Sequence, residues 1–331
     1  MSTPAIALPI AGEQRRSPSL KRFAREYSFA FALVLSLALL IANVIAQPDF
    51  GWKDQLATFA PLAVAAMAST PSIISGRGGF DLTISPLMTF ISVLFVTWLI
   101  PAGLGGAVSV PILLLIGAAI GALNGILIVG LRVPPMVVTL STYFVFIGLD
   151  LKLVDTPKTV DHSWTQHLAH DVGPIPGALF TIAMPLLIWF ALGRLPWRSA
   201  LFAVGSNDAT AYSSGVNVNL VRVGAYALGG LFAAVGAFAL TGLVSSVDSS
   251  QASAYTLVAI AGVALGGTPL TGGRGGILGS LLGASVIYLV ESLLSALQIN
   301  TTWLQIVYGA ALLIAVVASA RLTTVNVKEG K

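Results

Sequence analysis

The chain has 331 residues with a formal net charge of +4, and 56% of the residues are hydrophobic while only 9% are charged. Soluble globular domains carry about 25% charged residues, so this composition excludes a soluble domain and indicates a protein that crosses a membrane several times. The absence of cysteine excludes a disulfide framework, a thiolate metal site and a cysteine nucleophile.

Apolar segments long enough to cross, or nearly cross, a bilayer core of about 30 Å recur along the chain. They predict an all-α membrane protein of about ten transmembrane helices, with broken or re-entrant segments among them. We place these segments at about 28–46, 56–74, 86–101, 111–130, 135–151, 177–193, 221–244, 254–269, 277–297 and 302–320.

The basic residues fall unevenly on the two sides that this alternation defines. A basic N-terminal segment, 1–27, precedes an apolar run of full span length, which is typical of an uncleaved first span. With that segment in the cytosol, all but three of the 17 basic residues lie inside, as the positive-inside rule requires. The net positive charge therefore reflects topology and not a nucleic-acid partner. We expect a transmembrane domain at 28–320 and a cytosolic C-terminal tail at 321–331.

The largest segment expected outside is 152–176, which holds all three histidines. His167, His170 and Asp171 could share one face of a helical turn, as metal ligands sometimes do. A solvated loop with scattered histidines is the more usual structure, and spacing is the only metal-binding signature here, so we expect no metal site. A docking surface for an external partner fits this loop better.

Glycine and proline interrupt the apolar pattern on the expected cytosolic side, within 75–81, 132–135 and 266–276. Irregular backbone at membrane depth is tolerated only where protein buries it or water lines it. The breaks therefore indicate either a transport pathway or tight turns at the membrane surface. The tetrapeptide Gly-Arg-Gly-Gly occurs at 76–79 and again at 273–276, which suggests an internal repeat.

Polar groups within the apolar segments are few and mostly uncharged. The clearest ionisable one is Glu291, whereas an ion-coupled carrier would be expected to bury several carboxylates. Neutral groups such as Asn124, Thr139 and Tyr143 hold helices together or line a path for an uncharged polar solute. A stripe of small residues at i, i+4 and i+8 predicts close helix packing and consists of Gly117, Gly121 and Gly125.

The common motifs of enzymatic chemistry are missing from the sequence. The glycine-rich run at 266–276 is not followed by Lys-Ser or Lys-Thr, so it is not a phosphate-binding loop. The motifs G-x-S-x-G and H-E-x-x-H do not occur either. We therefore expect no enzymatic activity, and any ATP-driven process has to rely on another chain.

Residues 198–223 form a polar island between two apolar segments on the expected cytosolic side. Asn207 and Asp208 are suited to capping a short helix, and Gly215 is placed to end it. A capped helix between two spans offers a surface on which another protein can dock. A plain connecting loop is the alternative, and it is the commoner structure for a segment of this length.

Four sequence blocks occur in a fixed order: Gly-Gly-Phe-Asp-Leu-Thr at 78–83; Leu-Asn-Gly at 123–125 with Arg-Val-Pro-Pro at 132–135; Val-Gly-Ser-Asn at 204–207 with Ser-Gly-Val-Asn at 214–217; and Gly-Gly-Thr-Pro-Leu-Thr-Gly-Gly-Arg-Gly at 266–275. Together they resemble the membrane permease subunits of binding-protein-dependent ABC importers, in the branch of the ribose, xylose, galactose and autoinducer-2 permeases. The resemblance covers roughly residues 56–320, and its last two blocks are specific.

The resemblance implies a bacterial plasma (inner) membrane protein that imports a monosaccharide or similar small polar solute by alternating access. It implies a separate ABC ATPase that binds ATP and Mg, a second permease chain, identical or different, and a periplasmic or lipid-anchored solute-binding protein. The cytosolic coupling segment 198–220 would dock on the ATPase. The implied contact residues are Gly205, Ser206, Asn207, Asp208, Ala211, Ser214 and Gly215.

No cofactor is expected on this chain itself. For the substrate pathway, the sequence offers Asn124, Thr139, Tyr143 and Glu291. An alternative from a different functional class is a proton-coupled secondary carrier of a small polar solute, with Glu291 as its proton site.

Overall fold

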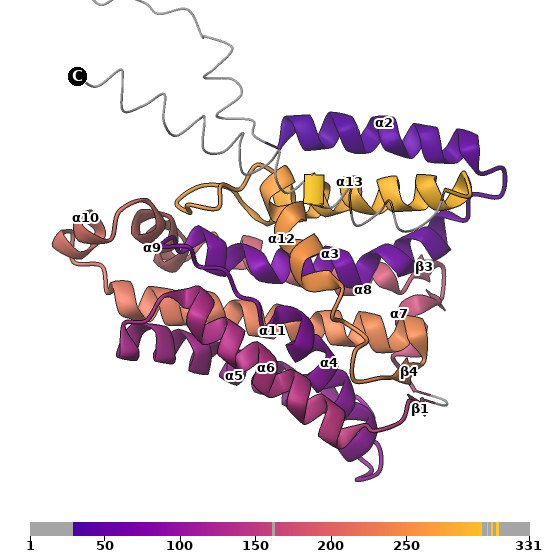
Figure 1. The fold of residues 1–331 in the computed structure, drawn as a ribbon, viewed down its shortest axis with the longest axis horizontal. Coiled ribbons are helices and arrows are strands. Elements are labelled where there is room, and N and C mark those ends of the chain that lie inside the picture. The colour runs from indigo at the N-terminus through magenta and orange to yellow at the C-terminus, as the bar shows by residue number, and fades with distance from the viewer. Residues whose placement is uncertain (1–28, 161–162, 300–302, 304–305, 307–308, 311–331) are drawn as a thin grey trace, which may run out of the picture.

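The computed structural model describes residues 29–160 and 163–299 together with residues 303, 306, 309 and 310. Most of this part of the chain is helical (Figure 1). The longer helices are α2 (Ala30–Ala46), α3 (Trp52–Ile74), α4 (Ile84–Leu94) with the π-helix η1 (Phe95–Leu99), α5 (Ser109–Leu131), α6 (Pro135–Leu153), α8 (Ala178–Leu192), α9 (Pro196–Ser206), α11 (Val218–Val244), α12 (Tyr255–Leu265) and α13 (Ile277–Ala296). The short elements are α7 (Gln166–Ala169), α10 (Asp208–Ser213), β1 (Lys158–Thr159), β2 (Asp171–Val172), β3 (Ile175–Pro176) and β4 (Ser246–Val247).

Each apolar segment predicted between residues 28 and 297 coincides with a helix in the structure. The last one, 302–320, lies almost entirely outside the described residues. Within the described part, five helices are long and apolar enough to cross a membrane, and the pair α8 and α9, bent by 89°, makes a sixth. Three further apolar helices, α2, α4 with η1, and α12, are shorter. A mostly helical architecture with several helices long enough to cross a membrane is thus confirmed, with four short strands besides, while the total of about ten spans and the cytosolic location of both termini stay predictions.

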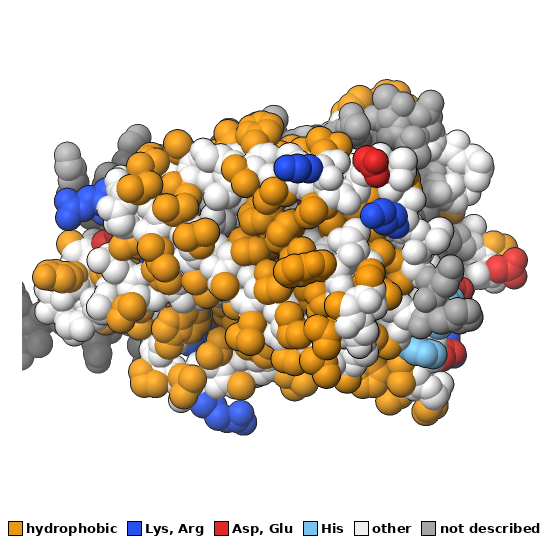
Figure 2. Space-filling model, turned by 90° about the horizontal axis from the view of Figure 1, so that it is seen from below, with side chains coloured by type: hydrophobic (Ala, Val, Ile, Leu, Met, Phe, Trp, Pro, Cys, Tyr) orange, Lys and Arg blue, Asp and Glu red, His pale blue; other side chains and the backbone are white. Residues whose placement is uncertain are grey.

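Helices α3 and α11 form the centre of the bundle (Figure 1). Of their most apolar stretches, 94% in α3 and 78% in α11 is buried inside the protein, against 33% in α5 and 22% in α6. Helix α11 contacts α3, α4 and α5, while α13 packs between α3 and the outermost helix, α2. Figure 2 shows hydrophobic side chains over most of the lower face, as expected for a surface that meets lipid.

Neutral polar side chains join the helices inside the bundle. Thr70 of α3 donates to the hydroxyl of Ser280 in α13 at 2.7 Å. Asn43 of α2 donates to the backbone carbonyl of Leu289 in α13 at 2.9 Å. Such hydrogen bonds hold helices together where lipid offers no hydrophobic drive for association.

Glycines on α5 bring its backbone against the backbone of α11. A side-chain carbon at Gly121 would overlap the carbonyl oxygen of Tyr226. Gly117 and Gly125 meet the backbone of the same helix in the same way. The close-packing stripe predicted from the spacing of these glycines is therefore confirmed, because each is a point where only hydrogen leaves enough room.

The two ends of the bundle differ in structure and in charge. At one end, which we call the α10 end, lie α9, α10 and the non-helical segments 75–83, 132–134 and 266–276; at the other, the β end, lie α7 and two small antiparallel sheets, β1 with β4 and β2 with β3 (Figure 1). The basic residues separate accordingly. Those at the α10 end are Arg77, Arg132, Arg194, Arg198, Arg222 and Arg274, and those at the β end are Lys53, Lys152 and Lys158.

We predict that Gly121→Ala destabilises the protein, because the added methyl group would overlap the backbone of α11. Overpacking of this kind costs about 1–3 kcal/mol. Gly130→Ala, in the same helix, is the matched control, since a carbon at Gly130 meets nothing within 4 Å and alanine is the better helix former. The measurement is the apparent melting temperature in detergent. Equal melting temperatures for the two variants would contradict the close packing of α5 on α11.

Candidate functional site

The polar island predicted between residues 198 and 223 contains a short capped helix, α10. The side chain of Asn207 accepts a hydrogen bond from the backbone nitrogen of Thr210 at 3.1 Å, which caps the first turn. After Ser213 the chain turns at Gly215, whose φ of +82° is a left-handed conformation that favours glycine. The predicted cap and helix end are confirmed, and the alternative of a plain loop is wrong.

Helix α10 projects from the bundle at its α10 end (Figure 1). Among its residues only Ala211 is buried. Of the other residues expected to contact an ATPase, Asn207, Ser214 and Gly215 are exposed. These side chains are available to a partner, whereas Ala211 anchors the helix to the protein.

Gly205 and Ser206, at the end of α9, lie against the two Gly-Arg-Gly-Gly segments. A side-chain carbon at Gly205 would overlap the carbonyl oxygen of Ile74 and lie 2.6 Å from the backbone nitrogen of Gly273. The same nitrogen donates to the carbonyl of Ile74 at 3.0 Å. Backbone from three distant parts of the chain thus meets at one point, which we call the glycine junction and define as Gly76, Gly205, Gly272 and Gly273.

Asp208, the first residue of α10, joins this helix to the rest of the bundle by ion pairs. A terminal nitrogen of Arg222, in the first turns of α11, lies 2.9 Å and 3.1 Å from the two carboxylate oxygens. The Nε of Arg77, which follows α3, lies 2.7 Å from the second of these oxygens. Asp208 is therefore held from two elements. Of the two residues expected to cap α10, Asn207 forms the capping hydrogen bond, whereas the side chain of Asp208 forms these ion pairs.

The sequence interpretation missed the ion pairs that Arg77 and Arg222 form with Asp208. Both were counted only for the side of the membrane on which they fall. The available signal was their rarity: only 9% of the chain is charged, so isolated charges beside two irregular segments invite pairing.

Two of the four residues proposed for the substrate pathway lie around the segment 75–83. Asn124 of α5 donates to the hydroxyl of Thr83 at 2.9 Å, and Thr139 of α6 donates to the backbone carbonyl of Phe80 at 3.1 Å. Both side chains are buried. In this structure they hold the irregular segment in place, which is the role that neutral polar groups in membranes most often have.

The other two proposed pathway residues lie elsewhere. Tyr143 is half-buried on α6 and makes an edge contact with Phe144. Glu291 is on α13, which Figure 1 shows on the far side of α3 and α11 from α5 and α6. The structure therefore does not bring the four residues into one site, and their role in a substrate pathway stays a prediction.

A buried polar cluster lies beneath α10. The carboxylate of Asp81 accepts hydrogen bonds from the backbone nitrogen and the hydroxyl of Thr83, both through Oδ1. Its other oxygen, like Oδ1 of Asn124 and the hydroxyl of Tyr226, has no hydrogen-bond partner among the described residues. Burial raises the pKa of Asp81 from 3.8 to about 6, although the bonds from Thr83 act in the opposite direction.

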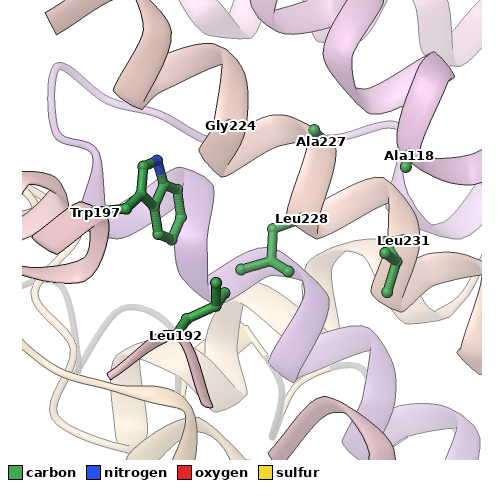
Figure 3. A pocket seen from close by; sticks show the side chains of 7 residues that line it. All are labelled: Ala118, Leu192, Trp197, Gly224, Ala227, Leu228 and Leu231. Carbon is green, nitrogen blue, oxygen red and sulfur yellow. The ribbon is translucent and has the colours of Figure 1, made fainter. Parts of the chain in front are cut away.

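Two hollows on the described surface differ in the polarity of their lining. One, of about 210 Å³, lies among α5, α8, α9 and α11, and Figure 3 shows that its lining is apolar, with Leu192, Trp197 and Leu228 around it. A sugar needs several polar groups to replace its hydration. A smaller hollow of about 130 Å³ at the β end is lined by Lys53 and His170 among others.

Among the described residues, no group of three or more histidine, aspartate or glutamate side chains is arranged to hold a metal ion, His167 and His170 included. His167 is part of α7, while Asp171 of β2 forms an ion pair with Lys53 at 2.6 Å. His162 lies outside the described residues.

Comparison with known proteins gives a family and close relatives. A family model described as "Branched-chain amino acid transport system / permease component" matches residues 27–316. The chain is 32% identical to the probable ABC transporter permease protein YphD of Escherichia coli, over 98% of each chain. It is 29% identical to the ribose import permease protein RbsC of Haemophilus influenzae, over 88% of this chain and 93% of that protein.

A third relative is the fructose import permease protein FrcC of Rhizobium meliloti, which is 28% identical over 86% of this chain and 82% of its own. No solved structure matches the chain.

We predict that Asp81→Asn makes the protein less sensitive to pH. The folded-state pKa of Asp81 is raised to about 6, so ionisation of Asp81 lowers the stability of the folded protein. This destabilisation is complete well above pH 6 and is absent below the unfolded pKa of 3.8. Lowering the pH from about 7.5 to 5 should recover about 1–2 kcal/mol, and asparagine, which keeps the acceptor oxygen for Thr83, should remove that gain.

The measurement is the apparent melting temperature in detergent at both pH values. Asp248→Asn is the control with the opposite sign, since hydrogen bonds from Ser250 lower the pKa of Asp248 and its contribution is lost as the pH falls. A wild-type pH response retained in Asp81→Asn would contradict the assignment.

Proposed function

Because the chain belongs to the family of the branched-chain amino acid transport system / permease component, we propose that it is the permease subunit of an ATP-driven ABC importer. The proposed cargo is a monosaccharide or a similar small polar solute. Relatives named for ribose and for fructose import match most of the chain, and one named for autoinducer 2 import matches 67% of it.

The observation that carries the mechanism is the attachment of α10. This helix projects from the bundle, is capped at its start by Asn207, and is tied through Asp208 to Arg77 and Arg222. Through α9 it also rests on the glycine junction. A partner that displaces α10 therefore pulls on the segments 75–83 and 266–276 together, because both are in direct contact with the same short stretch of chain.

We propose that the partner at α10 is a separate ATPase, which binds ATP and Mg and drives alternating access. The α10 end then faces the cytosol, which agrees with the larger number of basic residues there than at the β end. Both termini are cytosolic in this orientation, and the membrane is the bacterial plasma membrane. The β end, including segment 152–176, faces the solute-binding protein, and a second permease chain completes the membrane core.

The direct test is co-expression with candidate ABC ATPases, followed by co-purification and ATP-dependent uptake in proteoliposomes. We expect an ATPase to co-purify and uptake to require ATP and a binding protein. Uptake by this chain alone, driven by a proton gradient and abolished in Glu291→Gln, would instead establish the carrier alternative. Thermal-shift screening of the cognate binding protein against pentoses, hexoses and related polar solutes would identify the cargo.

We predict that Gly215→Trp uncouples ATP hydrolysis from uptake while the folded protein still reaches the membrane. A bulky residue there is strained at φ +82° and exposed where a partner would dock, yet a carbon at this position meets nothing within 4 Å. Gly103→Trp is the matched control, because Gly103 also has a positive φ, +74°, and open space around it, but lies in the turn between η1 and α5 at the β end.

The measurement is the number of ATP molecules hydrolysed per solute taken up. We expect this ratio to rise at least about tenfold in Gly215→Trp, which corresponds to a loss of coupling of about 1.4 kcal/mol. Coupled uptake at the wild-type ratio in Gly215→Trp would refute the docking role of this segment.

A further inference from the structure

Arg222 is a buried cation that is engaged on only one side. Its side chain is 6% exposed, and one terminal nitrogen binds both oxygens of Asp208 and, at 3.4 Å, the carbonyl of Ser75. Its Nε is buried as well and has no hydrogen-bond partner among the described residues. A buried donor without a partner is rare in proteins and requires an explanation.

Two further buried groups beside Arg222 share this property. Tyr226 follows one turn later on α11, and its hydroxyl is without a partner in the described part of the chain. Oδ2 of Asp81 is in the same condition. Arg222 and Tyr226 are one helical turn apart on α11, and Arg222 binds the carbonyl of Ser75 in the same segment, 75–83, that contains Asp81, so we treat the three groups as one cluster. It contains a donor, an acceptor and a hydroxyl that can be either.

We propose that Arg222 exchanges partners during transport. In the present conformation it binds Asp208 of α10, and when α10 is displaced it turns inward to bind Asp81 and Tyr226. Arg222 is then the positioning residue that carries the displacement of α10 into the interior of the bundle. The biological meaning of this exchange rests on the proposed function, in which an ATPase displaces α10.

The exchange leaves neither Arg222 nor Asp208 without an ionic partner in either conformation, and in the inward one Oδ2 of Asp81 gains the partner that it lacks at present. Arg222 passes from one carboxylate to another, as a guanidinium at this depth requires. Asp208 keeps Arg77 after Arg222 has left, and both lie nearer to solvent, with side chains 21% and 71% exposed. Because Arg222 and Asp208 keep ionic partners in both conformations, the two can lie close in free energy, which is the condition for a small external force to select between them.

The inward conformation would also act on the irregular segment 75–83. Asp81 belongs to this segment, and two nearby residues are bound to other helices. Thr83 accepts a hydrogen bond from Asn124 of α5, and the carbonyl of Phe80 accepts one from Thr139 of α6. Attraction between Arg222 and Asp81 would therefore pull segment 75–83, and with it the start of α6, toward α11 at the α10 end. In the present conformation Arg222 instead holds Ser75 and α10 together.

The test measures the position of α10 directly. The chain contains no cysteine, so two introduced cysteines suffice for spin labelling without a background. Ala209→Cys on α10 and Met136→Cys at the start of α6 are both exposed. The distance distribution between the two labels is recorded by pulsed electron resonance on the full chain in lipid nanodiscs, without any ATPase.

The two carboxylates should have opposite effects on this distribution. Asp208→Asn removes the outer partner, so the ratio of displaced to present conformation should rise by about 5- to 150-fold. Asp81→Asn removes the inner partner and should lower the same ratio. Tyr226→Phe, which changes no charge, should shift it in the same direction as Asp81→Asn. A structural role alone would loosen α10 in all three variants, so shifts in one direction, or no shift, overturn the exchange.

Asp155→Asn, an exposed acid at the β end, is the control and should leave the distribution unchanged. If Asp208→Asn does not fold, Asp208→Glu replaces it in the test. Glutamate keeps the negative charge but holds it on a longer side chain, so the ratio of displaced to present conformation should also change. The outcome is independent of the proposed function, since no ATPase is present. Failure of any ATPase to co-purify would refute the proposed function, whereas unidirectional shifts would refute the exchange alone.

Discussion

Close backbone contact along α11 is the constraint on which the rest of the structure depends. Gly121 of α5 leaves room for the carbonyl of Tyr226, and Gly229 of α11 faces the carbonyl of Ala68 in α3. Lipid is as apolar as a leucine side chain, so helices in a membrane associate through van der Waals contact and hydrogen bonds, both of which fall off steeply with distance. A central helix with small residues on several faces can therefore pack closely against several neighbouring helices, which larger residues would hold at a greater distance.

The same requirement explains why the irregular segments are found where they are. Non-helical backbone needs hydrogen-bond partners that lipid cannot supply. Segment 75–83 obtains them from Thr139 and its own Asp81, while Asn124 binds the side chain of Thr83, and Gly273 near the end of the second irregular segment donates to Ile74. From the sequence, these breaks were interpreted one by one, either as part of a transport pathway or as tight turns at the membrane surface. In the structure they are parts of one contact that also includes the end of α9.

Much of this could be predicted from sequence, for a physical reason. Span-length apolar runs identify helices because a single solvent, the bilayer, sets one length for all of them. The cap at Asn207 and the turn at Gly215 are encoded within a few residues and were predictable too. The pairing of Arg222 with Asp208 was not, since it depends on the angle at which α10 leaves α9. Nor was the contact of Arg222 with Ser75, 147 positions away in the chain. Asn124 and Thr139 were recognised as important, but hydropathy cannot tell a residue that lines a path from one that anchors a loop.

The glycine junction also sets an order on the assembly of the protein. Its members come from the segment after α3, from the end of α9 and from the segment before α13, so it cannot close until residues near 273 have left the ribosome and entered the membrane. Helix α10 is synthesised much earlier, yet it acquires its final support only when this late segment arrives. A chain interrupted before that point would hold most of its helices but would lack a firmly seated α10. The surface best placed to engage a partner is thus among the last parts of the protein to reach its final support.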